Sequence, residues 1–409
     1  MKKIIAMLMV LAMVFALVAC QTQQPQTEQP TVTEAPEAPA VTEAPAAPEV
    51  TEAPAEPEVT EAPAEPEVTE APAALNVALV TDVGNIDDKS FNQGAWEGVV
   101  AFCEANGMKQ GEGYNYYRPS EDSTEARVET IKTAITNGAN AIVCPGYLFE
   151  EAIFLVQADY PEVMFLLLDG EPHSADYATY TTTENTHNIL YQEEQAGFFA
   201  GYAAVKDGYK KLGFLGGMAV PAVVRYGYGF VQGANKAAEE MGVAADVSIK
   251  YWYCGGFAPT DDIKIKMAGW FTDGTEVVFA CGGGIYLSAV AAANEANGKV
   301  IGVDVDQSAE ADCIITSAMK GLTNSVVLAL EDLAANGGKW SADYAGKTAV
   351  LGAADDCVGL PTAEGSWRLS TFTVEEYQKL FEDVKAGTIE ISKDTENAPA
   401  VTIAVDYNA

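Results

Sequence analysis

Residues 78–98 read ALVTDVGNIDDKSFNQGAWEG, and this stretch decides the fold. It opens as a buried strand over 77–80, and the strand is followed by Thr81-Asp82 and a loop that carries Asp87-Asp88. Phe91-Asn92 then opens a helix. In an open parallel sheet, ligands lie in the crevice beyond the carboxyl ends of the strands. The stretch therefore predicts a carboxylate, an aromatic ring and a carboxamide at a ligand site.

Strands alternate with helices along the rest of the chain from Leu75. The first series predicts strands at 77–80, 114–117, 141–144 and 163–168, with helices at 91–106, 124–137 and 149–159. The second predicts helices at 188–206, 223–241, 261–271, 286–297 and about 322–336, with strands at 211–215, 247–253, 277–281, 300–303 and 316–319. Such βαβ series are typical of an α/β fold in which helices cover both faces of parallel sheets. Two series indicate two similar lobes that close around a ligand in the cleft between them.

Several short motifs carry a family resemblance. They are Thr-Asp at 81–82, Asp-Asp-x-Ser-Phe-Asn at 87–92, Trp-x-Gly at 96–98, YQEEQAGFFAGYAA at 191–204, IGVDVDQ at 301–307 and Thr-Ser-x-x-Lys at 316–320. On these motifs, the chain from Leu75 to about Leu360 resembles the basic membrane protein family of bacterial surface lipoproteins. That family includes purine nucleoside receptors, which are substrate-binding proteins of ABC transporters.

The resemblance implies the two-lobed periplasmic-binding-protein type I fold. Each lobe is then a parallel sheet flanked by helices, the chain crosses between the lobes three times, and the ligand lies in the interlobe cleft. We expect residues 75–182 and about 307–345 to form lobe 1. Residues 183–306 and about 346–409 are expected to form lobe 2.

Residues 1–19 have the pattern of a lipoprotein signal peptide, in which a short basic start precedes an apolar run too short for a stop-transfer helix. Leu17-Val18-Ala19-Cys20 is similar to a lipobox, which predicts cleavage before Cys20 and lipidation of its sulfur. Residues 20–74 form a linker in which VTEAPAEPE recurs, and it has no aromatic residue with which to build a core. We expect a lipid-anchored protein on the extracytoplasmic face of the cell membrane, although ordinary secretion is the alternative.

The formal net charge of −36 restricts the partners of the chain. Such an acidic protein is unsuited to nucleic acid and to anionic lipid headgroups, but it can bind a small neutral ligand. Besides Cys20 there are six cysteines, none of them in a Cys-x-x-Cys pair, and neither His173 nor His187 has a partner at metal or triad spacing. The sequence therefore predicts no metal and no cofactor. Cys144 and Cys281 lie in apolar strands and are expected to be buried free thiols, while disulfide pairing cannot be read from the sequence.

Strand ends supply the first candidate ligand contacts. Asp82 and Asp169 each follow a predicted strand, so their carboxylates are expected at the mouth of the cleft. Gly283 lies in a run of three glycines after another strand, where the missing side chain lets the backbone approach a ligand. Asp87 and Asp88 are instead expected to cap the following helix.

The resemblance implies how a nucleobase is bound. Phe91 stacks on one face of the base, with Asn92 beside it in the same motif. A second ring on the other face corresponds to Phe257, although Gly256 stands where the family has Ser. Trp252 and Tyr253 are the alternatives for this second ring.

The resemblance also implies how the ribose is bound. Asp304 matches the residue that accepts hydrogen bonds from the ribose hydroxyls, and Lys320 matches a ribose-contacting lysine. Together these residues predict a non-enzymatic receptor for purine nucleosides such as adenosine, guanosine or inosine. We expect a monomer that delivers its ligand to the permease subunits of an ABC importer.

Two alternatives remain open on the residues alone. The first is a sugar- or autoinducer-binding protein of the same fold, because strand-end carboxylates in a cleft suit sugars equally well. The second is a nucleoside hydrolase, because TDVGNIDD at 81–88 is similar to the calcium-binding start of that family. Val80 stands where the hydrolase motif has its first Asp, so a hard oxygen ligand is missing.

Overall fold

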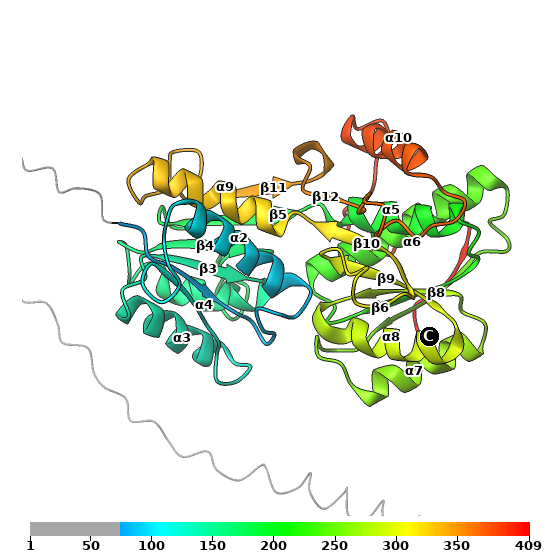
Figure 1. Ribbon diagram of the computed structural model, residues 1–409, viewed down its shortest axis with the longest axis horizontal. Helices are drawn as coiled ribbons and strands as arrows, with labels where there is room; N and C mark the ends of the chain where they lie inside the picture. The colour runs from blue at the N-terminus through cyan, green and yellow to red at the C-terminus, as the bar shows by residue number, and fades with distance from the viewer. Residues whose placement is uncertain (1–73) are drawn as a thin grey trace, which may run out of the picture. The chain divides into compact units, whose positions relative to one another are not determined.

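The computed structural model describes residues 74–409, which contain two sheets (Figure 1). The first sheet has the strand order β11-β5-β4-β3-β1-β2, and every neighbouring pair in it is parallel. Its strands are β1 (Val77–Val80), β2 (Tyr114–Tyr117), β3 (Ala141–Pro145), β4 (Met164–Leu168), β5 (Thr186–Tyr191) and β11 (Lys347–Leu351).

The second sheet has the order β12-β10-β9-β8-β6-β7-β13. Its strands are β6 (Lys211–Gly216), β7 (Ser248–Tyr253), β8 (Val277–Cys281), β9 (Lys299–Asp304), β10 (Ile314–Lys320), β12 (Val358–Gly359) and β13 (Ala404–Asp406). Only the short edge strand β12 runs antiparallel, against β10. A sheet of this kind buries both faces under helices.

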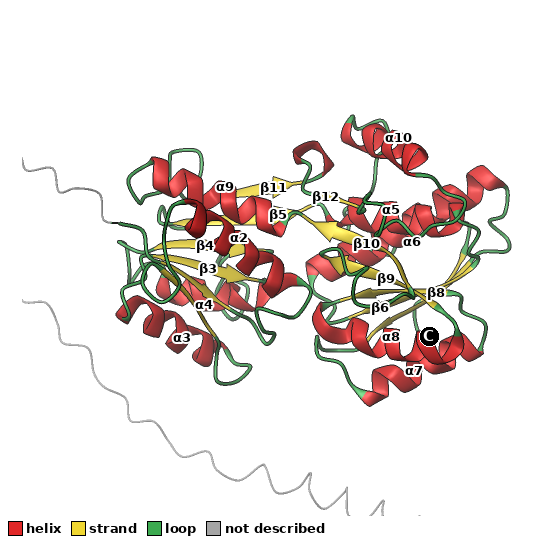
Figure 2. Cartoon of the chain, in the orientation of Figure 1, coloured by secondary structure: helices red, strands yellow, loops and turns green. Residues whose placement is uncertain are grey.

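Helices cover both faces of each sheet (Figure 2). They are α2 (Phe91–Ala105), α3 (Thr124–Thr136), α4 (Glu150–Val156), α5 (Glu193–Lys206), α6 (Pro221–Met241), α7 (Asp261–Thr272), α8 (Tyr286–Ala296), α9 (Leu322–Ala335) and α10 (Val374–Lys385), with 3₁₀ turns at Tyr147–Phe149, Gly283–Ile285 and Ala353–Asp355. They pack in pairs, namely α2 with α9, α3 with α4, α5 with α6 and α7 with α8. The predicted α/β fold of parallel sheets flanked by helices is confirmed.

Strand β1 illustrates why the sequence builds this architecture. Val77 and Leu79 belong to the core that contains α2 and α9, whereas Ala78 and Val80 belong to the core that contains α3 and α4. Successive side chains of a strand point to opposite faces, so a strand covered on both sides must be apolar throughout. This accounts for the unbroken apolar run at 77–80.

The sheets differ from the expected lobe boundaries at three strands. We expected residues 183–306 and 346–409 in lobe 2, but β5 and β11 lie in the first sheet. We expected residues 307–345 in lobe 1, but β10 lies in the second sheet, and only α9 returns to pack on α2. The chain consequently passes between the sheets three times, after β5, after β10 and after β11.

One of these strands corrects the predicted helix at 188–206. Residues Thr186–Tyr191 form β5, and α5 begins only at Glu193 with Gln192 as its N-cap. The strand is held on both sides, because it hydrogen-bonds to β4 and to β11. Neither neighbour is close in sequence, so the local apolar pattern could not distinguish the end of this strand from the start of the helix.

All six cysteines of the described residues are free thiols, and Cys144 and Cys281 are buried as predicted. Within residues 74–409, no helix combines the length and the apolar character needed to cross a membrane. The predicted signal peptide, Cys20 and the linker at 20–74 lie outside the described residues, apart from Ala74.

Candidate functional site

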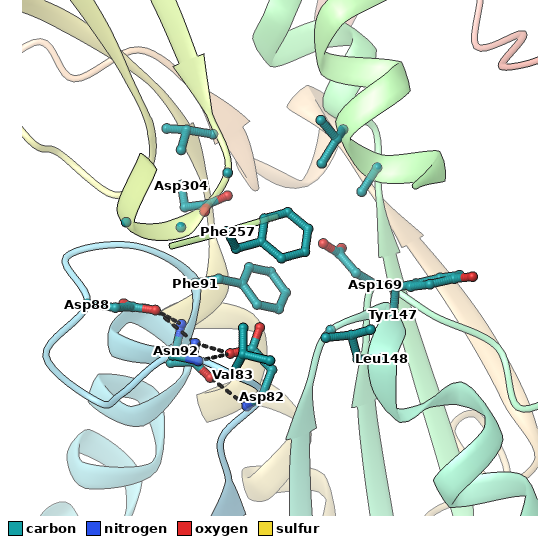
Figure 3. Close-up of a pocket in the computed structure, with 18 of the residues that line it drawn as sticks. Asp82, Val83, Asp88, Phe91, Asn92, Tyr147, Leu148, Asp169, Phe257 and Asp304 are labelled. Carbon is teal, nitrogen blue, oxygen red and sulfur yellow. Dashed lines mark hydrogen bonds between the residues drawn. The ribbon is translucent and has the colours of Figure 1, made fainter. Parts of the chain in front are cut away.

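A cavity of about 310 Å³ lies at the carboxyl ends of strands from both sheets (Figure 3). Strand ends of β1, β3 and β4 border it from the first sheet, and those of β8, β9 and β10 border it from the second. It is lined by all eight predicted ligand contacts: Asp82, Phe91, Asn92, Asp169, Phe257, Gly283, Asp304 and Lys320. The structure therefore brings together residues that are up to 238 positions apart, as between Asp82 and Lys320.

Two of the aspartates occupy an unusual backbone conformation. Asp169 has φ +60° after β4, and Asp304 has φ +66° at the end of β9. Asn and Asp tolerate this left-handed region better than other residues with a side chain. A polar residue of this type can thus turn the chain sharply at a strand end and still present a carboxylate to the cavity.

Asp82 is held in place by the loop and by α2. Its Oδ1 accepts hydrogen bonds from Gly84 N and Asn92 Nδ2, both at 2.7 Å, and the Asn92 amide oxygen accepts one from Asp82 N. Burial raises the pKa of Asp82 to about 6, in spite of these hydrogen bonds. Asp82 Oδ2 accepts no hydrogen bond from the described residues, which leaves it available to a ligand.

Asn92 and Asp88 support this arrangement. Asn92 is 2% exposed and donates from Nδ2 to both Asp82 and Asp88, so its carboxamide is already engaged within the protein. Asp88 accepts hydrogen bonds from the backbone N–H groups of Ser90, Asn92 and Gln93. The predicted capping role is therefore confirmed for Asp88. It is wrong for Asp87, which among the described residues accepts a hydrogen bond only from the Asn85 side chain.

Phe91 and Phe257 bring two aromatic rings into the same cavity from separate parts of the fold, as Figure 3 shows. Phe91 is the first residue of α2, and Phe257 follows β7. A Cβ on Gly217 would lie 2.5 Å from the Phe257 ring, and one on Gly282 would lie 3.0 Å from it. Phe257 therefore rests on the bare backbone at two strand ends, which explains why glycines follow β6 and β8.

Asp304 and Lys320 line the cavity, and the charged group of each already contacts another side chain of the protein. Asp304 is 6% exposed, and its Oδ2 accepts a hydrogen bond of 2.6 Å from Ser90 Oγ. Burial raises the pKa of Asp304. Lys320 Nζ lies 2.5 Å from Asp169 Oδ2. Burial raises the pKa of Asp169 to about 7. The first contact joins the N-cap residue of α2 to the end of β9, and the second joins the end of β10 to the residue after β4, which belongs to the other sheet.

Sequence reasoning missed two sets of residues at this site. Val83, Leu148, Val220, Ala222 and Val223 give the cavity apolar walls. Nothing in the sequence distinguishes them from core residues. Tyr226 also lines the cavity, and Glu193 and Arg225 form an ion pair behind it. The YQEEQAG motif could have pointed to Glu193, because a carboxylate in a buried first turn requires a partner.

The arrangement suits binding rather than catalysis. Carboxylate acceptors, the Lys320 ammonium group, the Arg118 guanidinium group and four aromatic rings lie among apolar walls, which is the composition of a small-molecule site. Trp96, by contrast, packs against Tyr114 and Tyr116 and does not line the cavity. Within residues 74–409, no three His, Cys, Asp or Glu side chains are grouped so that they could hold a metal ion.

The fold and the cleft define a class of protein. A solved ABC-transporter solute-binding protein from Aeropyrum pernix K1 has a TM-score of 0.66 at 20% identity, covering 78% of this chain and 94% of that one. A second, from Conexibacter woesei, has a TM-score of 0.59 at 21% identity, covering 78% and 99%. These likenesses establish the fold of a two-lobed solute-binding protein.

The family follows from the sequence. The profile of the Bmp family, described as ABC transporter substrate-binding protein PnrA-like, matches residues 75–395, and the chain belongs to this family. The resemblance to the basic membrane protein family is thereby confirmed. The chain is a substrate-binding protein of an ABC transporter and not an enzyme, so the nucleoside hydrolase alternative is set aside.

Three relatives illustrate the range of the family. The ABC transporter nucleoside-binding protein BmpA of Lactococcus lactis is 28% identical over 57% of this chain, and the match spans 64% of its own length, slightly under two thirds. The CD4+ T-cell-stimulating antigen of Listeria monocytogenes is 30% identical, covering 75% of this chain and 86% of the antigen. Basic membrane protein B of Borreliella burgdorferi is 27% identical, covering 71% and 81%.

Proposed function

We propose that this protein binds purine nucleosides such as adenosine, guanosine or inosine and delivers them to the permease subunits of an ABC importer. The observation that carries the proposal is that Phe91, from α2 beside the first sheet, and Phe257, from the loop after β7 of the second sheet, line one cavity together with Asp304 and Lys320. Aromatic faces stack on any base, and carboxylates accept hydrogen bonds from a cis-diol. A relative named as a nucleoside-binding protein supports the same assignment.

The proposal divides the cavity into two regions. The base lies between Phe91 and Phe257, with Asp82 Oδ2 as an acceptor for its polar edge. The ribose lies against Asp304, Asp169 and Lys320, and Gly283 lets the backbone approach the ligand. Asn92 supports this site from behind, since its carboxamide holds Asp82.

The proposal also includes the location of the protein. It is anchored through a lipid on Cys20 at the extracytoplasmic face of the cell membrane, as a monomer, with residues 20–74 as a spacer. The support for this is the signal peptide and lipobox pattern, together with membership of a family of ABC substrate-binding proteins.

Isothermal titration and thermal unfolding with a ligand panel test the binding. The panel contains adenosine, guanosine and inosine, with uridine, ribose and arabinose as controls. A purine nucleoside at 100 times its dissociation constant should add about 2.7 kcal/mol to the free energy of unfolding. Tight binding of a free pentose with no binding of any nucleoside would instead establish the sugar-binding alternative.

A further inference from the structure

The ammonium group of Lys320 is enclosed on nearly all sides. Its side chain is only 1% exposed, and Nζ lies 2.5 Å from Asp169 Oδ2 and 3.0 Å from Glu193 Oε1. The ring centres of Phe91, Tyr191 and Tyr226 lie 4.9, 5.0 and 5.4 Å from Nζ. Rings at this distance attract a cation, and the two carboxylates offset the cost of burying its charge. The position of Lys320 is therefore determined by its neighbours and not by its own flexible chain.

Glu193 is the carboxylate of this enclosure that lies outside the cavity. It is 0% exposed and does not line the cavity, so it cannot touch a ligand there. Its Oε2 accepts a hydrogen bond of 2.6 Å from Arg225 Nε, while Oε1 faces Lys320. Burial alone would raise the pKa of Glu193, but the charges of Lys320 and Arg225 outweigh burial and lower it to about 2. Glu193 therefore remains ionised.

Asp169 has the complementary character. It lines the cavity, and its Oδ1 is buried without a hydrogen-bond partner among the described residues. A ligand hydroxyl that approaches Asp169 finds this oxygen vacant, and the same approach competes for the carboxylate that holds Lys320. The contact from Lys320 to Glu193 lies behind the cavity wall, where a ligand does not reach.

We propose that Glu193 is a positioning residue for ribose recognition, which holds the Lys320 ammonium group at the cavity while the ligand engages Asp169. Arg225 fixes the far side of the Glu193 carboxylate. This inference rests on the proposed nucleoside function. It assigns a role to the YQEEQAG motif, which supplies both Tyr191 and Glu193.

The test is the titration of adenosine and 2′,3′-dideoxyadenosine into the full chain and its Glu193→Gln variant. Glu194→Gln is the matched control, because Glu194 occupies the same helical turn, is 3% exposed and forms no ion pair within residues 74–409. Glu193→Gln should weaken adenosine about tenfold, as expected for the loss of one charged interaction, and leave the dideoxy analogue nearly unchanged. Glu194→Gln should leave the ratio of the two affinities as in the wild type.

The ratio of affinities within one variant does not depend on the fraction of protein that is folded, so a loss of stability does not obscure the result. Arg225→Met is a second variant, and the Arg225 side chain that it replaces is 16% exposed. This variant should lower the ratio of adenosine affinity to dideoxyadenosine affinity by less than Glu193→Gln does. In a Lys320→Met background, Glu193→Gln should cause no further loss. Equal losses for both ligands, or the same loss without Lys320, would overturn the inference. If the wild type binds neither ligand, the proposed function fails and the inference fails with it.

Discussion

Asp304 combines a strained backbone with a buried carboxylate, and both restrict how it can be tested. Its φ of +66° lies in the left-handed region, where Ala is strained but Asn is tolerated. Its Oδ2 accepts a hydrogen bond from Ser90, and an Asn carbonyl can still accept this bond. The informative substitution at this position is therefore Asp304→Asn, which removes the charge and keeps the shape.

Asp304→Asn should weaken adenosine more than 2′,3′-dideoxyadenosine, because the diol is the group that the carboxylate accepts. Replacing a charged acceptor by a neutral one should reduce adenosine binding by about tenfold or more. The measurement is isothermal titration of both ligands into both proteins. Equal losses for the two ligands would show that Asp304 does not contact the diol.

Phe91 should contribute through its aromatic face and not through bulk alone. Phe91→Ala is expected to weaken purine nucleosides by roughly 1–3 kcal/mol, the usual value of base stacking. Phe91→Leu is the matched control, since it keeps an apolar side chain but lacks the π system. Titration should rank wild type above the Leu variant and the Leu variant above the Ala variant. If Phe91→Leu bound purine nucleosides as tightly as the wild type does, stacking at this position would be contradicted.

At the scale of elements, the contact between α5 and α6 positions the charged residues behind the site. Gly197 and Gly201 on α5 face the backbone of α6, and Gly229 and Gly233 on α6 face the backbone of α5. A Cβ at any of the four would overlap a carbonyl oxygen of the other helix. These glycines let the two helices approach closely and so bring Glu193 beside Arg225.

Gly233→Ala should destabilise the fold by roughly 1–3 kcal/mol, as overpacking does, because its Cβ would overlap the carbonyl oxygen of Phe198. Gly269→Ala in α7 is the control, since it is an exposed helical glycine with open space around it. It should stabilise the protein by about 0.5–1 kcal/mol through helix propensity. Urea unfolding of both variants checks the prediction. Similar effects of the two changes would show that close packing is not what selects Gly233.

At the scale of the whole molecule, buried carboxylates make stability depend on pH. Burial raises the pKa to about 6 for Asp82, to about 7 for Asp169 and to about 7 for Glu194. Their reference values are 3.8 for Asp and 4.5 for Glu. Between about pH 4 and pH 7 the folded state therefore binds more protons than the unfolded state. These groups should make the free energy of unfolding increase as the pH falls through this window.

We accordingly expect the ligand-free protein to be more stable at pH 5 than at pH 8. The net charge of −36 acts in the same direction, because protonation reduces self-repulsion. Urea unfolding at constant ionic strength measures how the free energy of unfolding changes with pH. Asp82→Asn should make this dependence shallower, because it removes one of the buried titrating groups. A stability that rises from pH 5 to pH 8 would contradict this prediction.

Cys20→Ser tests the proposed anchoring. The variant should move from the membrane fraction to the medium, because lipid chains on the sulfur supply the attachment. Its melting temperature should stay that of the wild type, since the linker composition around Cys20 predicts no contribution to a core. Cell fractionation followed by thermal unfolding gives both results. Retention in the membrane after a high-salt wash would mean that attachment does not require Cys20.

The sequence by itself determined the features that depend on neighbours along the chain. Apolar runs and helical spacing predicted the parallel sheets, and the strand ends identified Asp82 and Asp169 as residues of the cavity. Asp88 was predicted to cap α2 because its partners are two to five residues away. Backbone geometry within one turn decides such features, so they can be read from a local pattern.

Only the tertiary structure decided which distant groups meet. Ser90 and Asp304 are 214 residues apart, and Lys320 and Asp169 are 151 apart. Strand β5 escaped prediction because β4 and β11 pair with it from elsewhere in the chain. Glu193 was recognised only within a motif, because its partners come from α6 and the end of β10. A buried charge is stable only beside partners that folding brings to it, and local spacing does not encode those partners.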